Sequence, residues 1–318
     1  MAGPSFLHGK NSRVVFSNPS QTSQSFLGVL ASGSNVVTIV GNLPATLPLG
    51  ATVTGTGIPS STTVTAITQY TLTLSANATA SSSLTAPTLI SFALSNGASF
   101  DVSQFFNDVS VSTAVDPVET TTFQNSGVKT YISGLKEGSI TLAGFYDGSY
   151  AAVDEIMANA TANSADEAVI VFPDGGTAQN SVCHLARGLE NKYDLKTPVA
   201  GVVAVDTEIV ADGGVWRGFG QYFTTTSSGS TTAKNNGVPS TRGGLLIINV
   251  LALQGTLSLS FQHSANNVTY QTISGSTIST VGTVVLFLPN PLLQYTQLIW
   301  TLSGTSPTAT ICYGFARF

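Results

Sequence analysis

Charged side chains are scarce in this chain of 318 residues. They make up 8% of it, whereas a globular domain commonly carries roughly 25%. Residues 14–100 contain no Asp, Glu, Lys or Arg, and all sixteen acidic residues lie between Asp101 and Asp212. The N-terminal, middle and C-terminal segments therefore carry net charges of +2, −10 and +3, and shifts this abrupt indicate separate modules. Because tight DNA binding needs a basic surface, the acidic middle segment argues against it.

Cysteine and histidine are also rare, with two and three residues respectively. Cys183 and Cys312 fall in different modules, so we expect no structural disulfide and folding in a reducing compartment. Cys183 and His184 are adjacent, and neighbours on a strand point to opposite faces, so they should not act as a pair. The chain also lacks a G-x-S-x-G elbow, a Walker loop and clustered metal ligands. We therefore expect a protein that is not an enzyme, with no cofactor and no metal.

Long apolar runs are missing as well. No stretch of apolar residues is long enough to cross a bilayer as a helix, so we expect no membrane partner. Residues 1–5 lack the basic start and apolar core of a signal peptide, so we expect no secretion.

The chain is rich in strand-forming sequence. Hydrophobic residues make up 42% of it, and short alternating or β-branched runs are separated by Gly, Pro and Asn turns. One helix is predicted at about residues 150–160, where Val153, Ile156 and Met157 share an apolar stripe and Asp154 lies near the start. The predicted fold class is therefore mainly β, a β-sandwich with one flanking α-helix and two additional small β domains.

The middle segment has a distinctive order over about fifty residues. An aromatic-Asp-hydrophobic-Ser start at residues 100–112 is followed by VETTTF at 118–123, KTYI at 129–132 and GLKEGSITLAGFYDG at 134–148. This order is similar to that of the major tail tube proteins of long-tailed, siphovirus-type bacteriophages of actinobacteria. The resemblance covers residues 1–16 and 98–217, which it identifies as the tail tube domain.

The resemblance implies a structural virion protein. Its subunits would form hexameric rings that stack into a tail tube, assembled in the host cytoplasm, and double-stranded DNA would pass through without specific binding. The implied partners are the tape-measure, tail tip and tail terminator proteins. Residues 17–97 would then be an inserted small β-module, residues 218–244 a flexible linker and residues 245–318 a C-terminal β-sandwich appendage. Both appendages are candidates for binding host-surface glycans.

Three groups of residues are predicted to serve assembly. Alternation along a strand at 201–211 puts Asp206 and Glu208 on the face opposite the core, toward the channel or an intersubunit groove, and ordinary exposed acids are an equal explanation for them. The lumen-facing candidates are Ser110, Ser112, Thr141, Asp206 and Glu208. The predicted inter-ring stacking loop holds Asp116, Glu119, Phe123, Lys129 and Tyr131. The aromatic residues predicted to dock the linker on the ring are Trp216, Phe219, Tyr222 and Phe223, for which a small core under a loop is an equal explanation.

Two other hypotheses fit the Ser, Thr and Gly-rich β composition. One is a modular β-sandwich surface adhesin, and the other is a virion decoration protein. Self-assembly separates them from a tube subunit, because an adhesin stays monomeric and a decoration protein needs a capsid.

Overall fold

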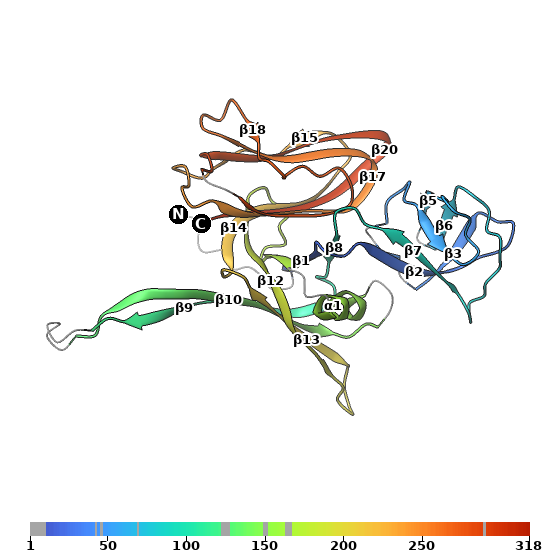
Figure 1. Ribbon diagram of the computed structural model, residues 1–318, viewed down its shortest axis with the longest axis horizontal. Helices are drawn as coiled ribbons and strands as arrows, with labels where there is room; N and C mark the ends of the chain where they lie inside the picture. Colours follow the sequence, from blue (N-terminus) through green and yellow to red (C-terminus); the bar gives the residue numbers. More distant parts are fainter. Residues whose placement is uncertain are drawn as a thin grey trace.

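The computed structural model describes residues 11–41, 43–44, 47–68, 70–121, 128–148, 152–162, 167–288 and 291–318. Within these residues the strands form a 14-stranded sheet and a six-stranded sheet, accompanied by one helix (Figure 1). The predicted fold class, mainly β, is confirmed.

The middle segment supplies a central body to the larger sheet. Its elements are β1 (Arg13–Asn18), β8 (Ala98–Asp101), β9 (Phe106–Glu119), β10 (Tyr131–Phe145), α1 (Val153–Ala162), β11 (Glu167–Phe172), β12 (Ser181–Lys196), β13 (Ala204–Ala211) and β14 (Trp216–Thr225). Strands β9, β10, β13 and β12 lie side by side in that order, all antiparallel. Helix α1 covers the inner face of these strands, where Val153 and Met157 are fully buried with Ile140 and Ile209.

Residues 23–93 fold as a barrel of their own. Its strands are β2 (Ser23–Val29), β3 (Val36–Val40), β4 (Val53–Gly55), β5 (Val64–Ile67), β6 (Thr71–Leu74) and β7 (Thr88–Ala93). The sheet order is β4-β7-β2-β3-β6-β5, and a bridge between Thr52 and Thr63 joins its two ends. Among the described residues of the barrel, this closure leaves no open edge for pairing with another chain. This barrel corresponds to the segment predicted as an inserted β-module and lies at one end of the molecule (Figure 1).

The C-terminal residues extend the larger sheet. Their strands are β15 (Gly229–Ser230), β16 (Lys234–Asn235), β17 (Gly244–Ser264), β18 (Gln271–Thr272), β19 (Gly282–Leu288) and β20 (Tyr295–Arg317). Strands β17 and β20 pair along almost their whole length and fold over on themselves to make two layers. Gly255 and Gly304, with φ of 98° and 131°, stand at the bend, where residues with a side chain are strained. Phe261, Tyr313 and Phe315 fill the core between the layers.

The flexible linker and the separate appendage predicted after residue 217 need correction. Strand β14 occupies the first part of residues 218–244 and pairs with β12 on one side and β20 on the other. Leu185 from the central body and Ile247 and Cys312 from the C-terminal strands share one fully buried cluster. The Ser and Thr content suggested flexibility, but the aromatic residues of β14 bury apolar surface against β20 and hold the segment in the sheet.

Candidate assembly surface

Strands β9, β10, β13 and β12 present one exposed face made of small, polar and acidic side chains. In-register neighbours on antiparallel strands point to the same side of a sheet. Ser110, Thr141 and Glu208 form one such row across three strands. Ser112 pairs with Ser139 in the row on one side of it, and Asp206 pairs with Ala143 in the row on the other side. The structure therefore brings all five predicted lumen-facing candidates together on one surface.

The opposite face of β13 is core, as the alternation predicts. Val205, Thr207 and Ile209 are all 0% exposed, whereas Asp206 and Glu208 between them are only half-buried. A shift of one residue in register would put the two carboxylates into the core. The alternation of residues along β13 therefore specifies which face is exposed to water.

The distal half of β12 adds basic residues to the exposed face, which the sequence analysis missed. Lys192 is in register with Glu208, and its Nζ lies 3.1 Å from Asp194 Oδ2. The hydrogen bond to Asp194 and the charge of that carboxylate raise the pKa of Lys192. Lys196 forms an ion pair with Asp206. The alternation of Lys192, Asp194 and Lys196 is the sequence signal that the strand continues to Lys196.

This four-stranded sheet has open edges on both sides. Among the described strands, β9 pairs only with β10. On the far side, the pairing of β12 with β11 stops at Gly188, so residues 189–196 are paired only with β13 within the described chain. Exposed edges of this length are templates for pairing with another chain.

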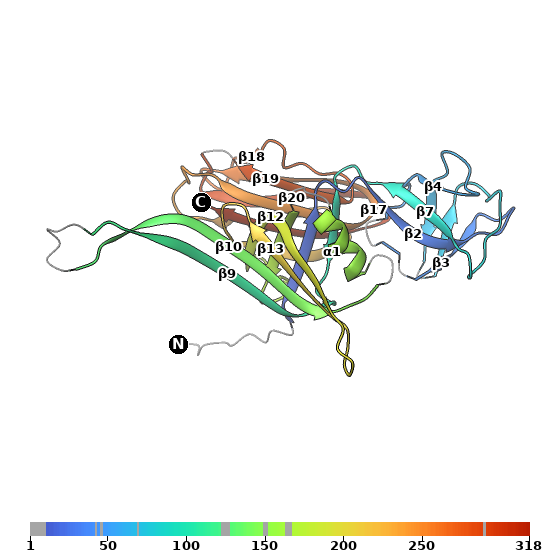
Figure 2. The same ribbon diagram turned by 60° about the horizontal axis from the view of Figure 1, so that its bottom comes forward.

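A long hairpin projects from one end of the sheet (Figure 2). Strands β9 and β10 stay paired as far as Glu119 and Tyr131, but β13 supports β10 only over Ser139–Phe145. The distal hairpin is exposed on both faces, because it has no layer beneath it. The predicted stacking residues Asp116, Glu119, Lys129 and Tyr131 lie on it or next to it, and Phe123 falls outside the described residues. Lys129 Nζ and Glu119 Oε2 are 3.0 Å apart.

Two carboxylates lie under this sheet, in the core. Glu167 is 1% exposed and Glu190 is 7% exposed, and the backbone N–H of Glu190 donates to Glu167 Oε2 over 3.2 Å. Thr207 Oγ1 donates to Glu190 Oε1. Burial, reinforced by the negative charge of Glu190, raises the pKa of Glu167 to about 8. Glu167 is therefore protonated in the folded protein at neutral pH, because an ionised carboxylate there would be poorly solvated.

The four aromatic residues predicted to dock the linker all lie on β14. They pack on the C-terminal strand, on the chain end and on the first strand of the body. The ring of Trp216 lies 4.2 Å from Phe318, Phe219 lies 5.5 Å from Phe315, Phe223 lies 4.9 Å from Trp300, and the guanidinium of Arg13 lies 3.5 Å above Tyr222. These contacts hold the C-terminal part of the chain on the central body.

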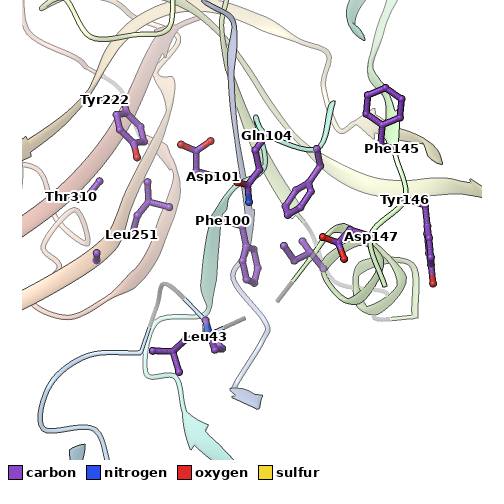
Figure 3. Close-up of a pocket in the computed structure, with 14 residues that line it drawn as sticks. Leu43, Phe100, Asp101, Gln104, Phe145, Tyr146, Asp147, Tyr222, Leu251 and Thr310 are labelled. Atoms are coloured by element: carbon purple, nitrogen blue, oxygen red, sulfur yellow. The ribbon is translucent and has the colours of Figure 1, made fainter. Parts of the chain in front are cut away.

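A cavity of about 760 Å³ opens where the barrel, the central body and the C-terminal strands meet (Figure 3). Aromatic rings from the base of the β9–β10 hairpin line one side of it. Its apolar lining includes Leu43, Phe100, Phe105, Phe145, Tyr146 and Tyr222. Asp101 and Asp147 add carboxylates to the wall, so the cavity is mixed in polarity.

No group of three or more His, Cys, Asp or Glu side chains is placed to hold a metal ion in the part of the chain that the structure describes. Among the described residues, no helix is long and apolar enough to cross a membrane.

Comparison with known proteins gives a distant likeness. No protein-family model matches the chain, and no curated protein matches it. Among solved structures, it is similar to the Dit protein (gp 19.1) of SPP1, described as a paradigm of the hub adsorption apparatus in Gram-positive infecting phages. The sequences are 11% identical, the match covers 68% of this chain and 96% of that chain, and the TM-score is 0.29. A TM-score this low does not establish a shared fold or function.

Proposed function

We propose that the chain is a structural subunit of a bacteriophage tail, and that it assembles into hexameric rings stacked as the tail tube. The observation that carries the proposal is the four-stranded sheet of β9, β10, β13 and β12, which is open at both edges and polar on its outer face. The order of residues 100–148, which resembles that of tail tube proteins, supports the same conclusion.

The two open edges suggest how a ring would close. Strand β9 of one subunit would pair with the distal half of β12 of the next, so that every open edge is satisfied in a continuous barrel. Strand β9 carries Asp108, Asp116 and Glu119 and no basic residue, whereas the exposed charges of distal β12 are Lys192 and Lys196 with one acid, Asp194, between them. Opposite charge on the two edges would favour this pairing over self-pairing of β9.

The exposed face of the sheet would then line the lumen. Serine and threonine rows leave room for a channel. The acids on this face, Asp108, Asp194, Asp206 and Glu208, outnumber its two lysines, Lys192 and Lys196, so the wall keeps a net negative charge. A wall of this kind repels phosphates and lets DNA slide during ejection. In the virion, the tube would meet the tape-measure, tail tip and tail terminator proteins at its ends.

Negative-stain electron microscopy of the purified protein over a concentration series tests the proposal. Rings or hollow tubes are expected. Replacing both Lys192 and Lys196 by Glu should abolish rings while leaving a folded monomer, because both lysines are on the surface. The matched control is Arg242→Glu, an exposed charge reversal outside the sheet, which should leave assembly intact. Dispersed monomers of the parent protein at every concentration would contradict a self-assembling tube subunit and favour the adhesin hypothesis.

A further inference from the structure

The β9–β10 strand pair has different surfaces at its two ends. One end is the projecting hairpin, and the other is the aromatic cavity at the hairpin's base. Ile132 and Phe145 mark these ends on the same strand. At about 3.3 Å per residue they are roughly 40 Å apart, so the hairpin of one molecule cannot reach its own cavity.

The projecting hairpin exposes several large apolar side chains to solvent. Its exposed apolar side chains are Val115 at 46%, Val118 at 48%, Tyr131 at 53%, Ile132 at 57% and Leu135 at 83%. Together they expose on the order of 500 Å², an area comparable to the largest apolar patch on a typical monomer. This surface is divided between the two faces of the hairpin, because Tyr131 points away from Ile132. Val118 and Ile132 are direct cross-strand partners, so part of this surface is one contiguous patch.

The cavity offers a surface of the same character. Phe145 is 49% exposed and Tyr146 is 36% exposed at its wall, although large aromatic side chains usually bury most of their area. Phe100 and Phe105 also line the cavity, and the close-up shows Phe100 between Tyr222 on one side and Phe145 and Tyr146 on the other (Figure 3).

We propose that the hairpin of one subunit docks in this cavity on a second copy, head to tail. The inference rests on the proposed function and names the surface that receives the stacking hairpin. A contact between two different patches of one chain is heterologous and does not close, so it repeats along an axis and builds a filament. A stable interface buries roughly 800 Å² per partner, and the two faces of the hairpin, both enclosed when it enters a cavity, together supply more than half of that.

Cysteine cross-linking tests this contact. The double variant Ile132→Cys, Phe145→Cys places one thiol on the hairpin and one at the cavity wall. The native Cys183 and Cys312 are both buried, so the new thiols are the accessible ones. After a short bis-maleimide treatment of assembled protein, a denaturing gel should show a ladder of covalent oligomers. Each single variant should give dimers at most, because a ladder needs two linked sites per subunit.

A comparison variant separates this contact from the alternative at the same end of the sheet. Val199, at the turn between β12 and β13, is fully exposed, and the double variant Ile132→Cys, Val199→Cys probes docking on that turn. Tubes in the microscope with a ladder only from the Phe145 pair support the proposal. Tubes without that ladder, or with a ladder only from the Val199 pair, overturn it and leave the tube function standing. A parent protein that never forms tubes overturns both.

Discussion

Replacing Glu167 by Gln should remove a large pH dependence of stability. In the unfolded chain this carboxyl ionises near its ordinary pKa, about 4.5, whereas the folded protein keeps it protonated up to a pKa of about 8. Between these values the folded state binds one more proton than the unfolded state. The free energy of unfolding therefore falls as pH rises through this window and levels off above it.

The size of the effect follows from the pKa difference. Each pH unit inside the window costs about 1.4 kcal/mol. From pH 5 to pH 8 the parent protein should lose on the order of 4 kcal/mol of stability through this group. Glutamine has nearly the same shape, and its carbonyl oxygen still accepts the hydrogen bond from the Glu190 N–H. The variant should thus match the parent at pH 5 and exceed it at pH 8.

Urea unfolding followed by tryptophan fluorescence at several pH values measures this difference, at a protein concentration below that of assembly. The matched control is Glu137→Gln, which changes an exposed carboxyl on the hairpin and should leave the pH profile unaltered. A Glu167→Gln variant that loses stability as steeply as the parent between pH 5 and pH 8 would refute the reasoning. A variant that is weaker by the same amount at every pH would refute it as well, because the pH dependence of the parent would remain.

Three further outcomes are expected. Leu185→Ala should lower the free energy of unfolding by about 2–5 kcal/mol. Both tryptophans should report a single urea transition, because the buried cluster around Leu185 joins the body to the C-terminal strands. Two separate transitions would contradict a shared core. Removal of Phe318 should cost about 1 kcal/mol through its ring contact with Trp216, and an unchanged urea midpoint would count against that contact. Glu119→Gln should change stability by less than about 1 kcal/mol, because its ion pair is exposed; a larger loss would mean that the hairpin is packed in solution.

The sequence was most informative where side chains alternate regularly. Along β13, apolar residues recur at every second position, and this period alone predicted that Val205 and Ile209 are core and that Asp206 and Glu208 face water. The helix was predicted at about residues 150–160 and lies at Val153–Ala162, since its apolar stripe has the helical period. Local periodicity is enough in both cases because the pattern and the structure share one repeat.

The sequence was least informative where distant segments meet. Strand β14 was predicted as part of a linker because Ser and Thr dominate the residues that follow it, and only β20, about ninety residues later, provides the surface on which its aromatic residues pack. The burial of Glu167 has the same origin. Its carboxyl is buried and accepts a hydrogen bond from Glu190 of β12, and no local signal marks a charged residue at the start of a strand as buried.

By itself, the sequence determined that the fold is mainly β, which single stretch is helical, and which face of β13 is exposed to water, because these follow from the spacing of apolar residues along the chain. Only the tertiary structure decided that the C-terminal strands share a core with the central body, that β9 and distal β12 leave two open edges, and that an aromatic cavity lies at the base of the hairpin. Each of these depends on contacts between residues far apart in the chain, and the spacing of residues along one strand carries no information about which strand lies beside it.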